Sequence, residues 1–184
     1  EVPKQVSARI PLAKREVFDF AKYPALTAVG KLSLLGGTWC TLTLVDEKIA
    51  VTAGHCLLVT NFKFDLTKPI PNGMMNVRLK PKGAAPIDDV FVKRVIKASL
   101  KPDFAIVELN RRIPSNLIRP LKVTATRSLD LRNSKAGLGC AGFNGDADLG
   151  SSGLLMTISR EIEIVDDSMV PERLDTNCFA TYGG

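Results

Sequence analysis

The only histidine of this 184-residue chain, His55, lies in the segment IAVTAGHC (49–56), directly before Cys56. The apolar residues at the start of the segment predict a buried strand, and the small residues after them predict a tight turn. Imidazole is the side chain that most readily exchanges a proton near neutral pH. His55 is therefore either a core histidine bonded to backbone, or a general base positioned at the end of a strand.

Asp103 is a second candidate, because it lies in KPDFAIVELN (101–110) at the point where a loop becomes an apolar strand. A carboxylate that enters a buried strand loses hydration and needs a partner. An imidazole N–H would suit it, since the carboxylate would hold the ring tautomer and stabilise the imidazolium. The alternative is a turn aspartate that caps its own backbone.

The four cysteines, at positions 40, 56, 140 and 178, form an even set without a CxxC pair. Zinc sites usually use closely spaced ligand pairs and several histidines, so no metal site is expected. We favour disulfides, and with them a secreted or otherwise extracytoplasmic protein; four reduced thiols in a cytosolic protein are the alternative. A hairpin of the segments 36–45 and 48–53 would bring Cys40 and Cys56 within bridging range.

Short apolar stretches rich in Val, Ile, Leu and Thr recur along the chain, separated by Gly, Pro and Asn. They predict strands at 26–35, 38–45, 48–53, 76–80, 89–98, 104–109, 121–126, 136–143, 153–165 and 176–184. Helical periodicity is weak, and 13–22 is the one candidate helix. Many short strands with turn signals indicate an all-β protein of the sandwich or barrel type. Its two halves should meet near residues 110–120.

The net charge of +6 is unevenly distributed: residues 61–101 contain nine Lys/Arg and three Asp/Glu, whereas residues 141–184 contain two and eight. Basic and apolar residues alternate, as on a strand with one solvated face. Nucleic acid is not an expected partner, because no aromatic residues interleave the charges. No run of eighteen apolar residues is present, so no membrane span is expected. The first residues lack the pattern of a signal peptide, so we expect either that the protein is not secreted or that its signal has already been removed.

Together these segments resemble the chymotrypsin-like (trypsin-family) serine proteases. VTAGHC (51–56) is similar to the family's TAAHC signature, with Gly54 in place of an alanine. The resemblance spans about residues 22–184. Further segments that carry it are YPALTAVGKL (23–32), GGTWCTLTLVDEKIAVTAGHCL (36–57), DFAIVELNRRI (103–113), IRPLKV (118–123) and AGFNG (141–145), where Phe143 replaces a tryptophan.

The resemblance implies a fold of two six-stranded antiparallel Greek-key barrels, the second of them incomplete in this chain. It implies that His55 is the general base, that Asp103 orients it, and that Cys40 and Cys56 form a disulfide. The implied protein is a secreted serine endopeptidase that is made as a zymogen, acts on protein or peptide substrates and needs no cofactor. The implied division of the chain is an extension (1–21), the first barrel (22–112), a linker (113–121) and part of the second barrel (122–184).

The family's nucleophile is a serine in a Gly-Asp-Ser-Gly-Gly turn, whose backbone N–H groups also form the oxyanion hole. Two alignments of CFATYGG (178–184) with this turn remain open. In the first, which we favour, Gly183 and Gly184 begin the turn, and the serine lies beyond Gly184 or on a companion chain. In the second, Tyr182 stands at the nucleophile position, and the chain is an inactive homologue that binds a protein partner.

The number of strands supports the first alignment. Only about four strands are recognisable after the linker, too few to close a second barrel, so a second polypeptide segment is expected to complete it. On this alignment three residues line the near wall of the substrate pocket, and none is a carboxylate that would select Lys or Arg. They are Phe179, Ala180 and Thr181.

Two further features of the second half are weaker candidates. Ser151 and Ser152 lie between glycines but lack a preceding aspartate, so they predict a solvated turn and not a nucleophile. Cys140 and Cys178 either pair with each other or bond to a cysteine in the expected further segment. The even number of cysteines favours the first pairing.

Overall fold

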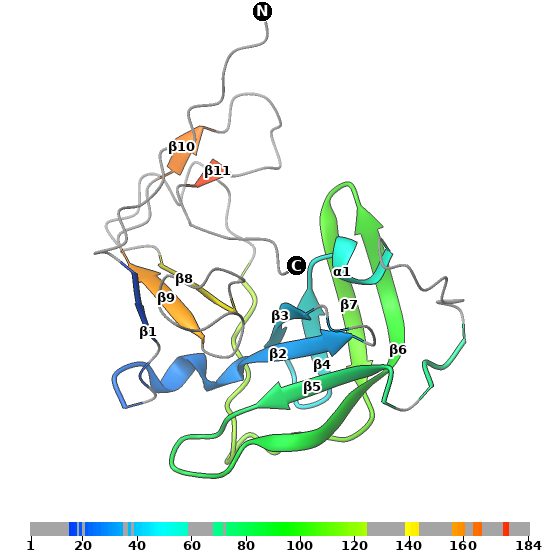
Figure 1. Cartoon of the computed structure of the whole chain (residues 1–184), viewed down its shortest axis with the longest axis horizontal. Coiled ribbons are helices and arrows are strands. Elements are labelled where there is room, and N and C mark those ends of the chain that lie inside the picture. Colours follow the sequence, from blue (N-terminus) through cyan, green and yellow to red (C-terminus); the bar gives the residue numbers. More distant parts are fainter. Residues whose placement is uncertain are drawn as a thin grey trace, which may run out of the picture.

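The computed structural model describes residues 15–17, 19, 21–34, 37, 39–58, 68–71, 73–124, 139–143, 156–160, 164–166 and 175–176. Its strands are β1 (Arg15–Val17), β2 (Val29–Leu34), β3 (Trp39–Leu44), β4 (Ile49–Thr52), β5 (Met75–Leu79), β6 (Ile87–Leu100), β7 (Asp103–Leu109), β8 (Gly139–Gly142), β9 (Thr157–Arg160), β10 (Ile164–Asp166) and β11 (Asp175–Thr176) (Figure 1). Its helices are a 3₁₀ helix, η2 (Pro24–Ala28), and a single α-helical turn, α1 (His55–Leu58).

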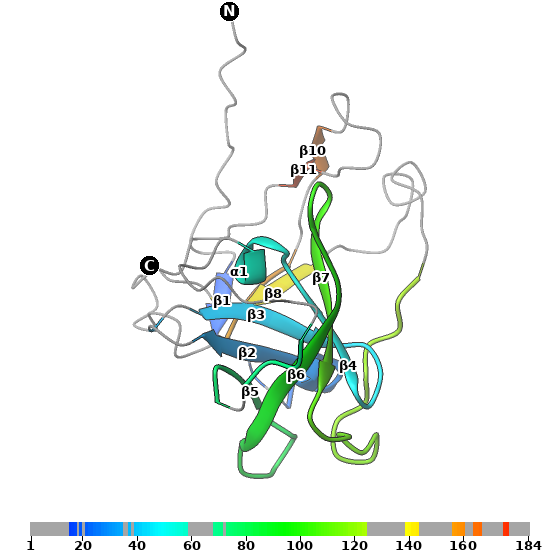
Figure 2. The ribbon, with the colours of Figure 1, turned by 90° about the vertical axis from the view of Figure 1, so that its right-hand side faces the viewer.

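Six antiparallel strands close into a barrel in the order β2-β3-β4-β7-β6-β5, with β5 pairing back onto β2 (Figures 1 and 2). The predicted alternation is clearest in β5, where Met75, Val77 and Leu79 are buried and the residues between them are exposed. Side chains of this kind from all six strands fill one core, which the closed hydrogen-bond ladder protects from water. The prediction of an all-β, chymotrypsin-like fold is confirmed, with one barrel closed.

The connector between the halves packs on this barrel. Ile113 and Ile118 are fully buried in the barrel core. The Ile113 amide donates to the Glu47 carbonyl at 2.6 Å, and the Leu121 amide donates to the Leu44 carbonyl at 2.9 Å. The connector is therefore held against the β3–β4 turn, although its sequence has little periodicity.

Beyond the connector, the described residues form a three-stranded antiparallel sheet, β1-β9-β8, and a two-stranded sheet of β10 and β11. The first of these sheets meets the barrel through a small apolar cluster that includes Val29 of β2 and Met156. None of the helices in the described part of the chain has the length and apolar character needed to span a bilayer.

Three predicted elements were wrong in detail. The candidate helix at 13–22 is not formed: Arg15–Val17 are strand β1, whose backbone hydrogen bonds are satisfied by β9 and not by a helical turn. Residues 121–124 are not a strand, because they do not pair in a sheet ladder. The single strand expected over 153–165 is two strands, β9 and β10.

Candidate active site

His55 is the first residue of α1 and follows β4 after a two-residue turn. The turn is fixed by the Gly54 carbonyl, which accepts hydrogen bonds from the amides of Leu57 at 3.0 Å and Leu58 at 2.9 Å. Cys56 and Leu57 are buried, whereas the His55 side chain is 44% exposed. The short helix thus anchors itself through its middle residues and presents the imidazole at the surface.

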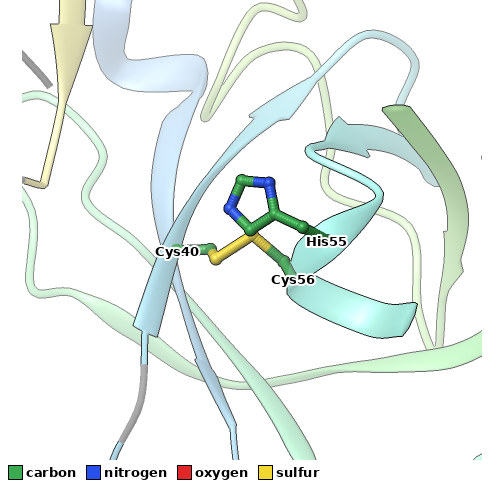
Figure 3. A group of neighbouring side chains, drawn as sticks. All are labelled: Cys40, His55 and Cys56. Atoms are coloured by element: carbon green, nitrogen blue, oxygen red, sulfur yellow. A yellow bond between two sulfur atoms is a disulfide. The ribbon is translucent and has the colours of Figure 1, made fainter. Parts of the chain in front are cut away.

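A disulfide between Cys40 and Cys56 joins α1 to β3, with a Cα–Cα distance of 6.4 Å (Figure 3). The imidazole of His55 lies next to it, and one nitrogen of the ring and both sulfur atoms are within 4.8 Å of one another. The sulfur atoms are bonded to each other and are not thiolates, so this trio does not have the chemistry of a metal site. The disulfide holds the histidine-bearing turn on the barrel.

Asp103 is the first residue of β7 and contacts His55 through both carboxylate oxygens. Oδ1 accepts a hydrogen bond from the His55 backbone amide at 2.8 Å, and Oδ2 lies 2.6 Å from the ring atom Nδ1. Two contacts from one carboxylate fix the ring in position as well as in tautomer. The residues singled out by the sequence are therefore brought together, 48 positions apart in the chain.

The glycine at position 54 is required by the close approach of the β6–β7 hairpin. A Cβ atom on Gly54 would lie 1.9 Å from the carbonyl oxygen of Ser99 and 2.8 Å from that of Phe104. Backbone oxygens cannot give way as a flexible side chain can. The absence of a side chain at Gly54 thus allows the hairpin that carries Asp103 to dock directly on the histidine turn.

The Asp103 carboxyl has a pKa below its usual value. Partial desolvation raises the pKa, but hydrogen bonds from the His55 ring and the His55 amide, the charge of the ring and a bond from the Gly54 amide together outweigh it. Asp103 is therefore an anion at neutral pH. An anion beside Nδ1 stabilises a protonated ring, so Nε2 is the nitrogen suited to exchange a proton with a hydroxyl group.

Thr41 of β3 links the two halves next to this site, a role that its sequence context did not suggest. Its Oγ1 accepts a hydrogen bond from the Phe143 amide at 2.9 Å. A Cβ on Gly142 would lie 2.8 Å from the same Oγ1. The backbone after β8, where the sequence resembles the family's Gly-Trp-Gly turn, therefore packs directly on the first barrel.

The remaining candidates fall mostly outside the described residues. These are Ser151, Ser152, Cys178, Phe179, Ala180, Thr181, Tyr182, Gly183 and Gly184. Cys140, in β8, is disulfide-bonded. Ser99, near Asp103 in the sequence, lies in β6 and bonds through its Oγ to the backbone of Lys101.

A family model described as Trypsin matches residues 21–183 of the chain. The chain belongs to the trypsin family. Among solved structures, this trypsin-family chain is similar to the scabies mite inactivated protease paralogue S-D1, with a TM-score of 0.57 and 15% sequence identity. The similarity covers 83% of this chain but 63% of that one, so the chain spans less than two thirds of the neighbour's length. A comparison with curated proteins finds no match.

Proposed function

We propose that this trypsin-family chain contributes the histidine and aspartate of a secreted serine endopeptidase. The observation that carries the proposal is the two-point contact between Asp103 and His55. A histidine on a disulfide-anchored turn, held through Nδ1 by an ionised carboxylate, is the arrangement that a hydroxyl nucleophile needs from its base. The Cys40–Cys56 disulfide supports the extracytoplasmic location.

In the proposed reaction, Nε2 of His55 takes the proton of a serine hydroxyl as its oxygen attacks the carbonyl carbon of a peptide bond. Asp103 stabilises the imidazolium that forms. The imidazolium then donates its proton to the departing amine. The other half of the substrate remains bonded to the serine as an acyl-enzyme. His55 next takes a proton from water as the water oxygen bonds to the ester carbon. The ester bond then breaks, the carboxylic acid product leaves, and the imidazolium returns the proton to the serine oxygen.

The serine of the proposed enzyme follows Gly184 or is supplied by a companion chain. In the alignment that we favour, Gly183 and Gly184 begin the nucleophile turn, and glycine amides there would serve the oxyanion. Phe179, Ala180 and Thr181 then precede the serine and line the primary pocket. Because none of them is charged, we propose a small or apolar residue before the cleaved bond.

The second candidate function is an inactive homologue that binds a protein partner. It is favoured by the alignment that places Tyr182 at the nucleophile position. The scabies mite protein to which the chain is similar is also named as an inactivated protease paralogue. A phenol is bulkier than a serine hydroxyl and would not be activated as a nucleophile at this position. Such a protein would therefore keep the pair of His55 and Asp103 but would not hydrolyse peptides.

Labelling with a fluorophosphonate probe separates the two candidates, since the probe bonds covalently only to an activated serine. The natural protein that contains this chain, in its processed form and with any companion chain, should be labelled. His55→Ala should lower the labelling rate by about 10⁴-fold or more. Ser99→Ala is the matched control and should label normally, because Ser99 bonds to backbone and not to His55. Absence of labelling in the folded and proteolytically processed natural protein would contradict the enzyme and support the inactive homologue.

A further inference from the structure

In the second half of β6, exposed residues come in neighbouring pairs because the strand contains two bulges there. Val92 pairs with Leu109 and Arg94 with Glu108, so Lys93 is an extra residue opposite β7. A bulge of this kind turns two neighbouring side chains toward the same side of a sheet. Lys93 and Arg94 are accordingly both exposed, with exposed side-chain fractions of 50% and 61%.

The second bulge repeats this arrangement one step closer to the hairpin end. Val95 pairs with Val107 and Lys97 with Ile106, so that Ile96 is the extra residue. Ile96 is 49% exposed although it is a large aliphatic side chain, and Lys97 beside it is also exposed. Lys93, Arg94, Ile96 and Lys97 therefore form one exposed surface, which we call the β6 ridge.

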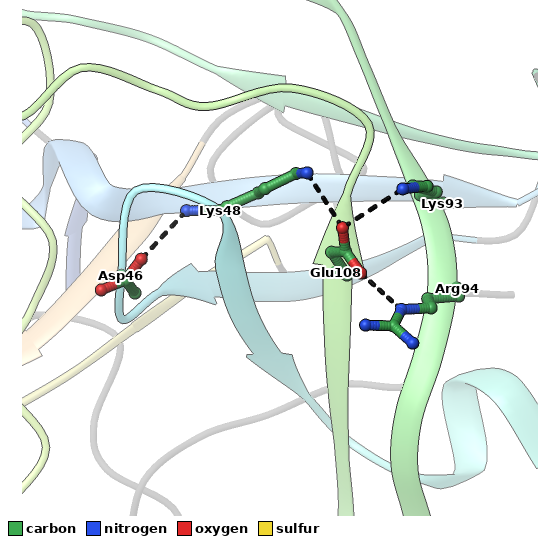
Figure 4. A network of polar contacts seen from close by, with 5 residues as sticks. All are labelled: Asp46, Lys48, Lys93, Arg94 and Glu108. Carbon is green, nitrogen blue, oxygen red and sulfur yellow. Dashed lines mark hydrogen bonds and ion pairs between the residues drawn. The ribbon is translucent and has the colours of Figure 1, made fainter.

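One carboxylate contacts several cationic side chains at the end of the ridge that is farther from the β6–β7 turn. Glu108 of β7 contacts Lys48 at 3.0 Å, Lys93 at 3.5 Å and Arg94 (Figure 4). Hydrogen bonds from Lys48 and Arg94 lower the pKa of Glu108 to about 2, so it carries one full negative charge at neutral pH. Among these four side chains, one negative charge faces three positive charges. The Asp46 carboxylate of the same network accepts a hydrogen bond from the Lys48 backbone amide, so the network as a whole has a net charge of +1 (Figure 4).

Lys97 adds a further positive charge on the same face. Its Nζ lies 5.9 Å from the centre of the Phe104 ring, so its contact in the sheet is aromatic and does not neutralise it. The ridge thus combines an excess of positive charge with an exposed aliphatic side chain at its middle. At about 3.3 Å per residue it covers roughly 15 Å of β6.

We propose that the β6 ridge docks an acidic polypeptide segment that carries apolar side chains between its carboxylates. Charge complementarity supplies the attraction, and Ile96 selects the class of partner. A sulfated polysaccharide would use the cations but has no apolar side chain to cover Ile96. A nucleic acid would also contact the cations through its phosphates, but it has no aliphatic side chain to cover Ile96, and stacking of single-stranded bases favours aromatic rings. The docking does not depend on whether the chain hydrolyses peptides.

The probe for this site is a fluorescein-labelled synthetic peptide of about 12 residues in which Asp and Glu alternate with Leu. Fluorescence anisotropy with the full chain should show binding that weakens as the salt concentration rises. The double variant I96S/K97Q should weaken binding by about tenfold, because it removes the apolar contact and one charge. Lys82→Gln is the matched control: it also removes one exposed positive charge, but outside the ridge, and should change the Kd by less than about twofold.

Two comparisons decide the result. Ile96→Ser alone should weaken binding of the peptide by about threefold and leave the affinity for a heparin oligosaccharide of equal charge unchanged. Thermal unfolding should be unchanged in each variant, since the substituted side chains are exposed. Three results would each overturn the proposal. The first is that the wild type does not bind the peptide, and the second is that Lys82→Gln and I96S/K97Q lose the same amount of peptide affinity. The third is that heparin binds tightly while Ile96→Ser does not change the affinity for the peptide.

Discussion

At the scale of single residues, His55 and Asp103 form an exposed contact, and its geometry is fixed by the elements that carry the two residues and by the bonds between them. The Asp103 side chain is 41% exposed, so burial does not hold it in place. Its position is set by the strand that begins at this residue and by bonds to the ring and to the amide of His55. Because these bonds favour the anion, the folded protein binds the Asp103 proton more weakly than the unfolded chain does.

The pKa of Asp103 should therefore rise toward the ordinary aspartate value when His55 is replaced by alanine, because the bond and the charge of the ring are lost. The pair stabilises the fold fully at pH values above the ordinary Asp pKa, and this contribution is lost as the pH falls through the lower pKa of the folded state. Carboxyl ¹³C NMR of the wild type and His55→Ala measures both values. The same midpoint in the two proteins would mean that the ring does not hold the carboxylate.

At the scale of elements, the site depends on how closely the β6–β7 hairpin docks on the turn before α1. Gly54→Ala places a methyl group against the carbonyl oxygens of Ser99 and Phe104. The hairpin must then move away, and overpacking of this kind typically costs about 1–3 kcal/mol. We expect a lower free energy of unfolding by that amount in urea denaturation, together with slower fluorophosphonate labelling. Unchanged stability would show that the hairpin does not lie where we describe it.

The elements also show where sequence reasoning succeeds and where it stops. Alternation in 76–80 predicted β5, because one face of that strand meets the core and the other meets water. Alternation could not reveal the bulges of β6, since an extra residue places two neighbours such as Lys93 and Arg94 on one side. Strand β1 was missed because three residues carry almost no periodic signal and its partner β9 is far away in the sequence.

The candidate active site, like the strands, could be predicted only in part from the sequence. The resemblance to the protease signature singled out His55 and Asp103, and the structure places them in contact. It did not explain why Gly54 replaces an alanine, since the cause is a backbone approach from a distant hairpin. The departure from the family signature at Gly54, next to a candidate residue, is the sequence signal that could have drawn attention to this contact.

At the scale of the whole molecule, the two halves meet through a few polar and apolar contacts beside the site. A hydrogen bond from the Phe143 amide to Thr41 joins the backbone after β8 to the barrel. Thr41→Val keeps the shape but leaves the amide unpaired, which should cost about 1 kcal/mol. Differential scanning calorimetry checks this, with Thr43→Val on the same strand as the control. An equal loss in both variants would assign the effect to β3 itself.

The central claim is that Asp103 holds the Nδ1 proton of His55. Because His55 is the only histidine in the chain, ¹⁵N-histidine labelling gives one ring to observe without ambiguity. The wild type should show a strongly downfield, slowly exchanging proton on Nδ1, and Asp103→Ala should abolish it. A ring that exchanges its protons freely in the wild type, or a spectrum that Asp103→Ala leaves unchanged, would contradict the claim.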